Sequence, residues 1–216
     1  MLNIVIVGAG GLGREVYQWA KDAFPRTQYR VKGFLSNRPE DLDGFEQEER
    51  ILSDDLSYAV QEDDRFLFAI GDIEVKKRIV VRMKARSAQF LTLIHPTAVV
   101  AGSAHIGEGV IVCPFALVSD HVVLGDFVLM NFYSSCGHDA KVGKYGIFSP
   151  YATANGFVTI EDEVCLGTHA TVAAHRRIGV GAKISANSVA MQDVPARAFV
   201  YGVPGKTKMI FSPDRD

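Results

Sequence analysis

An adjacent histidine and aspartate, His138 and Asp139, form a pair with obvious chemical potential. A carboxylate beside an imidazole can hold one tautomer of the ring and raise its basicity, which suits the pair to accepting a proton as a general base. The pair lies in the stretch CGHDAKVG, residues 136–143, where a hydrophobic residue recurs every six positions. What the pair can do therefore depends on the fold that this repeat specifies.

The repeat keeps its frame from Val100 to Ile184, which makes fifteen hexads. The residue after the hydrophobic one is often Gly, and the fifth is often Ala, Val or Ser. Such a repeat predicts a parallel β-helix, in which each hexad forms a short strand and a corner and three hexads close one triangular coil. A β-sandwich would instead need irregular turns about every 8 to 12 residues. We therefore expect five coils.

In this fold, residues eighteen apart occupy the same place in successive coils, about 4.8 Å from each other. One coil beyond His138 is Gly156. A glycine there leaves room for a substrate atom and exposes a backbone N–H beside the base, and acyl transfer needs a proton acceptor next to an oxyanion donor. We predict His138 as the general base, Asp139 as the residue that tunes it, and Gly156 N–H as the oxyanion donor.

Metal binding is the alternative use of histidines on a β-helix, and it needs three ligands that converge on one point. His121 and His175 share the expected column of Asp139 but lie three coils apart, and His169 falls on another face. We therefore expect no metal site within one chain, although an interface between subunits could gather these side chains.

The first ninety residues alternate short apolar runs with helical patterns. They predict strands at 2–8, 29–35 and 65–71 and helices at 11–24, 53–61 and 74–86, with Ser53 as the N-cap of the second helix. Alternating strands and helices predict a small parallel sheet. The expected domains are an α/β domain at 1–90, the β-helix at 91–195 and a C-terminal cap at 196–216.

A complete G-x-G-x-x-G motif, made by Gly8, Gly10 and Gly13, stands between the first strand and the first helix, where it can hold a pyrophosphate. Two features disfavour an NAD-dependent oxidoreductase. No acidic residue follows the second strand to bind a ribose, and about ninety residues make only half of a dinucleotide fold. The alternative is that these glycines only form a tight turn.

Composition narrows the remaining possibilities. The net charge of −2 and pI near 6.3 provide no electrostatic footprint for nucleic acid or an anionic membrane. Three cysteines without CxxC spacing fit reduced thiols. No run reaches the roughly 18 apolar residues of a membrane helix, and the start reads as a strand and not as a signal peptide. We expect a soluble, cytoplasmic protein.

Five segments together resemble one protein family: GAGGLGREV, FAIGDIEVKKRI, LIHPTAVV, the CGHD stretch, and DVPARAFVYGVPGK. They are similar to the hexapeptide-repeat sugar acetyltransferases of bacteria, namely the nucleotide-linked 4-amino-sugar N-acetyltransferases and the sialic acid O-acetyltransferase-like proteins. The resemblance covers nearly the whole chain. It implies a half-Rossmann domain followed by a left-handed parallel β-helix, acetyl-CoA as co-substrate, and a homotrimer with active sites between subunits. We expect Phe127, Phe132 and Tyr133 to be exposed, which is compatible with such an interface.

The resemblance also implies binding residues. It supports His138 as base and Gly156 N–H as donor to the thioester carbonyl. Ser36 and Asn37 stand where some relatives carry an acidic pair that contacts the nucleobase, so the base is left open. Ile147 stands where some relatives have a second histidine. The implied nucleotide-sugar contacts are Gly10, Gly11, Leu12, Ser36, Asn37 and Gly71, and the implied acetyl-CoA contacts are Ile147, Gly156, Thr168 and Ala186.

Basic residues toward the C-terminus are candidates for the CoA phosphates, or else form a solvated basic end. They are Arg176, Arg177, Lys183, Lys206 and Lys208. Arg176 also occupies a hexad place that is otherwise nearly always small, and the sequence offers no reason for it.

The expected reaction is acetyl transfer from acetyl-CoA to the amine of a nucleotide-linked amino sugar. Two alternatives remain open. One is a sugar O-acetyltransferase that uses the same base, and the other is a non-catalytic scaffold that binds sugar nucleotides.

Overall fold

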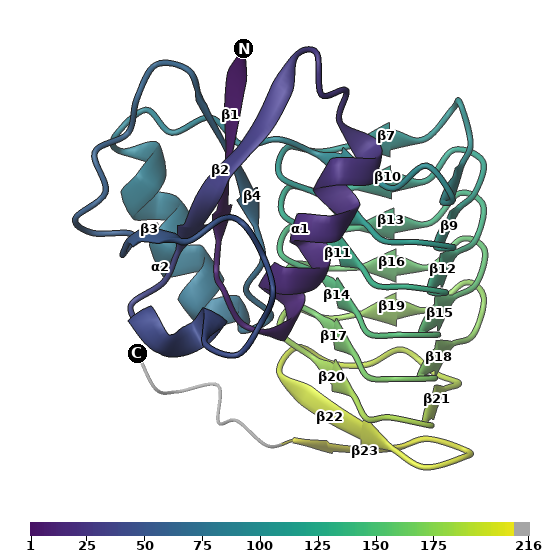
Figure 1. Ribbon diagram of the computed structural model, residues 1–216. Coiled ribbons are helices and arrows are strands. Elements are labelled where there is room, and N and C mark those ends of the chain that lie inside the picture. Colours follow the sequence, from purple (N-terminus) through teal and green to yellow (C-terminus); the bar gives the residue numbers. More distant parts are fainter. Residues whose placement is uncertain (210–216) are drawn as a thin grey trace. The chain divides into compact units, whose positions relative to one another are not determined.

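The computed structural model describes residues 1–209 (Figure 1). The chain divides into two compact units, residues 1–96 and the residues from Thr97 onward. No helix among the described residues is long and apolar enough to cross a membrane.

The first unit is built on a four-stranded parallel sheet with the strand order β3-β2-β1-β4 (Figure 1). The predicted strands and the first and third predicted helices are confirmed to within three residues at each end. The elements are β1 (Leu2–Val7), α1 (Gly11–Ala23), β2 (Tyr29–Leu35), the 3-10 helix η1 (Pro39–Leu42), β3 (Ile51–Ser53), β4 (Asp64–Phe68), α2 (Ile73–Lys84) and then β5 (Leu93–Ile94).

The helix expected at 53–61 is wrong. Residues 51–53 form β3, and the chain then makes a single turn in which the Asp54 carboxylate accepts the Leu56 and Ser57 N–H groups at 2.9 and 2.6 Å. The carbonyls that a helix would pair with its own N–H groups are taken by the Arg86 guanidinium, which donates to the carbonyls of Asp55, Leu56 and Tyr58. A tertiary contact therefore replaces the helical hydrogen bonds.

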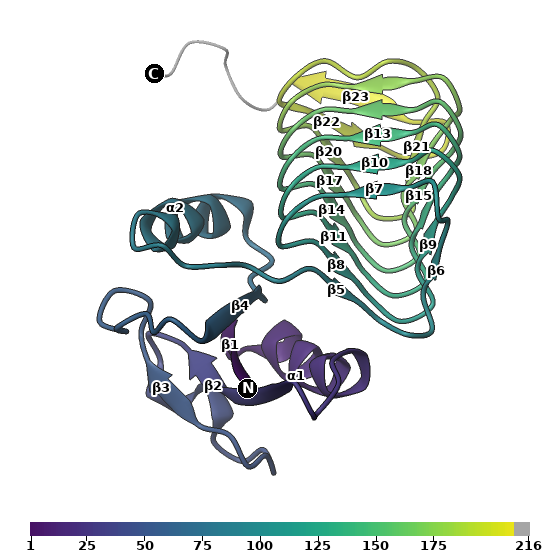
Figure 2. The same ribbon diagram turned by 90° about the horizontal axis from the view of Figure 1, so that it is seen from above.

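The second unit is a parallel β-helix with a two-residue strand every six residues (Figure 2). All fifteen predicted hydrophobic positions are the second residue of a strand, and thirteen of them are buried. The in-frame strands are β6 (Val99–Val100), β7 (His105–Ile106), β8 (Ile111–Val112), β9 (Leu117–Val118), β10 (Val123–Leu124), β11 (Leu129–Met130), β12 (Ser135–Cys136), β13 (Lys141–Val142), β14 (Ile147–Phe148), β15 (Thr153–Ala154), β16 (Thr159–Ile160), β17 (Cys165–Leu166), β18 (Thr171–Val172), β19 (Arg177–Ile178), β20 (Lys183–Ile184) and β21 (Val189–Ala190).

Three parallel sheets form the faces of the coils, and each strand pairs with the strand eighteen residues away, as Ser135 does with Thr153. The frame ends after β21. Strand β22 (Ala198–Tyr201) pairs with β20 so that Lys183 faces Phe199, sixteen residues on, and β23 (Lys206–Met209) returns antiparallel to β22. The hairpin closes the last coil of the described chain.

Corners repeat one backbone conformation. From Gly109 to Asn187, one residue per corner has a positive φ, such as Asp139 at 59°, Phe157 at 58° and His175 at 61°. These three share one column, because the strands on either side of them pair at an offset of eighteen residues. The corner backbone therefore fixes the neighbours of Asp139 from one coil to the next.

Candidate active site

His138 and Asp139 lie on the corner between β12 and β13. His138 Nδ1 is 2.9 Å from Asp139 Oδ2, and about half of each side chain is exposed. Because a carboxylate only accepts hydrogen bonds, Nδ1 carries the proton toward Asp139 and Nε2 keeps its lone pair. The predicted pairing of the two residues is thus present in the geometry, with Nε2 able to accept a proton.

Gly156 lies directly against the His138 ring. A Cβ built at position 156 would be 2.8 Å from both Cε1 and Nε2 of His138. The imidazole therefore occupies the space that a side chain at position 156 would fill. From the sequence we expected this space to be open to a substrate atom. Within residues 1–209, no acceptor pairs with the Gly156 N–H.

A second imidazole–carboxylate pair stands one coil before His138. His121 Nδ1 is 2.9 Å from Asp120 Oδ2, and Ser103 also donates to Asp120. The Ser103 hydroxyl, with the neighbouring imidazoles, lowers the pKa of Asp120. We did not predict this pair from the sequence, because its residue order is the reverse of that of His138 and Asp139. It makes the corner around His138 rich in negative charge.

Predicted acetyl-CoA contacts lie on more than one part of the β-helix. Thr168 and Ala186 are exposed and stack one coil apart on the corner that follows β17 and β20. Ile147 is buried in β14. Of these residues only Gly156 shares the corner of His138. Within one chain, the structure does not bring Thr168 and Ala186 to the base.

The basic candidates for CoA phosphates are also dispersed. Arg177 pairs with Glu161, and Arg176 reaches Asp193 at 4.0 Å while its Nε donates to the Ala174 carbonyl. Lys206 is exposed on β23. The Arg176 guanidinium thus turns toward Asp193, which comes shortly after the last in-frame strand.

A cavity of about 870 Å³ opens in the first unit at the carboxyl ends of its strands. All six predicted nucleotide-sugar contacts line it: Gly10, Gly11, Leu12, Ser36, Asn37 and Gly71. Sequence reasoning missed Arg78 and Arg82, which reach the cavity from α2. Their spacing of four residues places both on one side of a helix, which was the available signal.

The glycines around this cavity separate into two groups. A Cβ on Gly13 would be 2.1 Å from the Gly8 carbonyl oxygen, so Gly13 is needed for the close contact of α1 with the turn after β1. A Cβ on Gly10 or Gly71 would meet nothing within 4 Å. The fold does not need glycine at these two positions, and the free space beside them belongs to the cavity.

A carboxylate is present in the cavity beside Ser36, although positions 36 and 37 are neutral. The Ser36 hydroxyl donates to Asp41 at 2.6 Å, and Arg38 pairs with Asp41 at 2.9 Å. Asp41 also lines the cavity. The charge that the sequence lacks at positions 36 and 37 is thus supplied by η1.

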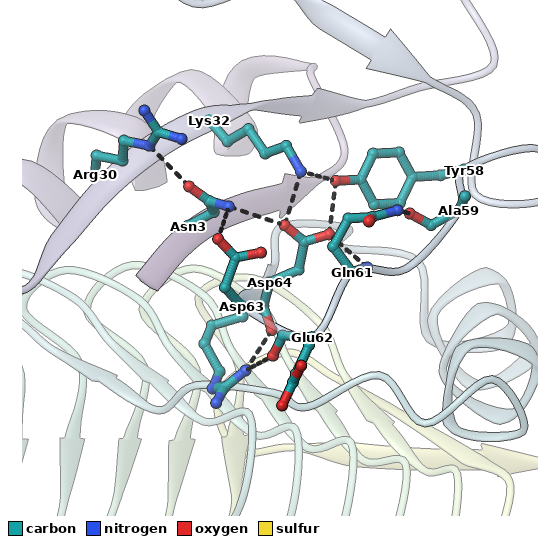
Figure 3. A network of polar contacts seen from close by, with 10 residues as sticks. Asn3, Arg30, Lys32, Tyr58, Ala59, Gln61, Glu62, Asp63 and Asp64 are labelled. Atoms are coloured by element: carbon teal, nitrogen blue, oxygen red, sulfur yellow. Dashed lines mark hydrogen bonds and ion pairs between the residues drawn. The ribbon is translucent and has the colours of Figure 1, made fainter. Parts of the chain in front are cut away.

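A polar network joins Asn3, Arg30, Lys32, Tyr58 and Asp64 in the first unit (Figure 3). Asp64 accepts hydrogen bonds from Lys32 at 2.9 Å and Tyr58 at 2.7 Å, and Lys32 also donates to the Tyr58 hydroxyl at 2.8 Å. Residues 54–56 line the cavity and stand just before Tyr58 of this network in the chain. Arg82 holds Asp55 at 2.7 Å from the other side.

Within residues 1–209, no group of three His, Cys, Asp or Glu side chains is arranged to hold a metal ion.

The expectation that Phe127 is exposed is wrong: only 2% of it is accessible, because its ring fills the space above Gly109 and stacks on Tyr145. Tyr133 is exposed and Phe132 is half-buried.

Residues 3–83 match the PglD N-terminal domain. Among characterised proteins, the chain is 34% identical over 107 residues to the GDP-perosamine N-acetyltransferase of Escherichia coli O157:H7, covering 50% of this chain and 48% of that protein. The chain spans about half the length of the curated relatives it matches.

Two solved structures resemble the chain over almost its full length. One is PerB from Caulobacter crescentus in complex with CoA and GDP-perosamine, with a TM-score of 0.87, 25% identity, and coverage of 95% of this chain and 97% of that one. The other is the acetyltransferase domain of PglB from Neisseria gonorrhoeae, with a TM-score of 0.88, 27% identity, and coverage of 96% and 100%. Residues 3–83 thus match a PglD N-terminal domain, and over almost its full length the chain shares the fold of these two structures.

Proposed function

We propose that the protein transfers an acetyl group from acetyl-CoA to the amine of a nucleotide-linked amino sugar. The observation that carries the proposal is the His138–Asp139 pair packed over Gly156, whose N–H has no acceptor within the described chain. Base and oxyanion donor are side by side, as acyl transfer requires. The names of the E. coli relative and of the PerB complex supply the substrate class.

The reaction follows from these groups. The amine attacks the thioester carbon, its N–H proton passes to His138 Nε2, and the Gly156 N–H donates to the carbonyl oxygen as it becomes negative. When the tetrahedral intermediate collapses, the C–S bond breaks and the thiolate takes the proton from His138. Asp139 stabilises the imidazolium between these two steps.

The nucleotide sugar would bind in the cavity of the first unit. The exposed N–H groups at the start of α1, which has no side-chain cap, suit a diphosphate, and Arg78 and Arg82 add positive charge to the same cavity. We take the 4-amino-4,6-dideoxy sugars as the substrate type, by analogy with the perosamine-specific relatives.

We further propose a homotrimer whose active sites lie between subunits. Support comes from the separation of His138 from Thr168 and Ala186, which occupy different corners of one chain. A neighbouring subunit would supply the second corner. Coexpression of His138→Asn with Thr168→Trp tests this: random trimers should recover about one quarter of wild-type activity, since each site needs one intact contribution from each side. No recovery would contradict sites shared between subunits.

The reaction itself is tested by incubating acetyl-CoA with UDP-, GDP- and dTDP-linked 4-amino-4,6-dideoxy sugars and with their 4-hydroxy counterparts. Thiol release with one amine and none of the hydroxyl sugars, together with an amide in the product, supports N-acetylation. Turnover of a hydroxyl sugar to an ester would favour the O-acetyltransferase, and bound acetyl-CoA without any turnover would favour the scaffold.

A further inference from the structure

Three groups surround the His138 ring, and two of them have roles already described. Asp139 holds Nδ1, and Gly156 lies against the Cε1–Nε2 side. The third is Phe157, whose ring centroid is 5.1 Å from that of His138 at an interplanar angle of 90°. Such an edge-to-face contact is a favoured arrangement of aromatic rings. The single hydrogen bond at Nδ1 fixes only one atom of the half-exposed ring, so its orientation depends also on the groups that it packs against.

Phe157 is itself fixed relative to His138. Its backbone N–H donates to the His138 carbonyl at 3.0 Å, so the two residues are tied directly from one coil to the next. On its far side the ring stacks on His175, with centroids 4.8 Å apart and planes within 6° of parallel. The φ of 58° at Phe157, uncommon for a bulky residue, is that of the corner and sets the direction in which the ring leaves the backbone.

We propose that Phe157 is a positioning residue for the reaction: its ring, braced by His175, holds the His138 imidazole so that Nε2 faces the reacting amine. This rests on the proposed role of His138 as the general base. Precise orientation of a base matters because a displacement of about 1 Å can cost a factor of 100 in rate.

An exposed aromatic ring at a corner is not unusual in this protein. Phe115, Tyr133 and Tyr151 stack on one another along another corner, with centroids 5.0 Å apart. Phe157 differs from these in its contact with the His138 ring. Phe115 is nevertheless a close match for Phe157 in other respects, with 53% against 49% exposure and a φ of 60° against 58°. It is therefore the control position.

The test compares Phe157→Leu, Phe157→Tyr and the control Phe115→Leu. Steady-state kinetics with both substrates are combined with thermal unfolding and with the chemical shift of the His138 Cε1 proton in the unliganded protein. We expect Phe157→Leu to lower kcat roughly tenfold or more with little change in KM for acetyl-CoA, and Phe157→Tyr to restore most of it. Phe115→Leu should retain wild-type kcat.

A raised KM for acetyl-CoA at unchanged kcat would assign Phe157 to substrate binding and overturn the proposal. An equal loss of kcat in Phe157→Leu and Phe157→Tyr would also overturn it, because the aromatic ring would then not be responsible for the effect. The chemical shift of the His138 Cε1 proton distinguishes a failure of this proposal from a failure of the proposed function. It should move in Phe157→Leu whatever the reaction is, whereas failure of the base assignment appears as full activity of His138→Asn.

Discussion

The His138 imidazole lies against Gly156, so closely that a Cβ at position 156 would come within 2.8 Å of Nε2. The base and the backbone N–H that we assign to the oxyanion therefore belong to successive coils and are held together by the pairing of β12 with β15. Glycine is required here by the imidazole of the preceding coil.

Gly156→Ala should consequently displace His138 and lower kcat/KM by roughly 100-fold or more, because both base and donor lose their alignment. Steady-state thiol release measures this. Gly102→Ala is the matched control, since a Cβ there meets nothing within 4 Å, and it should retain activity. Near-normal activity of Gly156→Ala would show that the contact of His138 with Gly156 has no catalytic importance.

Asp139→Asn should lower kcat roughly tenfold to a hundredfold. Asparagine accepts the left-handed backbone that Asp139 has at φ 59°, so the corner is kept. Its amide can donate to Nδ1, which would place the proton on Nε2 and remove the lone pair that accepts the substrate proton. Kinetics with saturating substrates measure the change, and an unaltered kcat would show that Asp139 does not set the tautomer.

Substitutions of glycines around the cavity test whether these glycines are needed for ligand binding or for folding. Gly71→Ala has space for its Cβ but narrows the cavity, so it should leave thermal stability unchanged and weaken nucleoside diphosphate binding by roughly tenfold. Gly13→Ala should instead destabilise the first unit by about 1–3 kcal/mol, because its Cβ clashes with the Gly8 carbonyl.

Calorimetric titration with GDP, UDP and dTDP, alongside thermal unfolding, measures both effects. If Gly71→Ala binds every nucleotide as well as the wild type, the cavity is not the nucleotide site.

The buried Asp64 makes the stability of the first unit depend on pH. Burial alone would raise the pKa of Asp64, but hydrogen bonds from Lys32, the Gln61 N–H and Tyr58 outweigh it and hold the pKa below its ordinary value. The stabilisation is therefore present above the unfolded pKa of about 3.9 and is lost as the pH falls through the lower folded value. Asp64→Asn should cost about 2–4 kcal/mol at pH 7 and flatten this acidic dependence.

Denaturant unfolding followed by the fluorescence of Trp19, the one tryptophan, reports on this unit because Trp19 lies in α1. If the free energy of unfolding depends on pH in the same way in Asp64→Asn and in the wild type, Asp64 is not the source of the loss of stability in acid.

Much of the fold could be predicted because its period is strict. Each hexad from Val100 to Ile184 places one side chain inside the coil, so a local pattern fixes a non-local pairing eighteen residues away. The same register placed Gly156 beside His138. Prediction failed where tertiary contacts override local preference, as at 53–61, where Arg86 takes the carbonyls that a helix would use.

The site was predicted unevenly for a similar reason. The six contacts that the family resemblance implies all line the cavity, whereas Arg78, Arg82 and Asp41 reach it from elements whose placement no motif records. Phe127 was misjudged because the space above Gly109, which its ring fills, is visible only in three dimensions.

The proposed reaction depends above all on His138 as the general base. The most direct measurement is thiol release by His138→Asn with the best amine substrate, together with calorimetric binding of acetyl-CoA to the same variant. Our account predicts that turnover falls by roughly 100- to 10,000-fold while acetyl-CoA binding is unchanged. Turnover close to that of the wild type would contradict it.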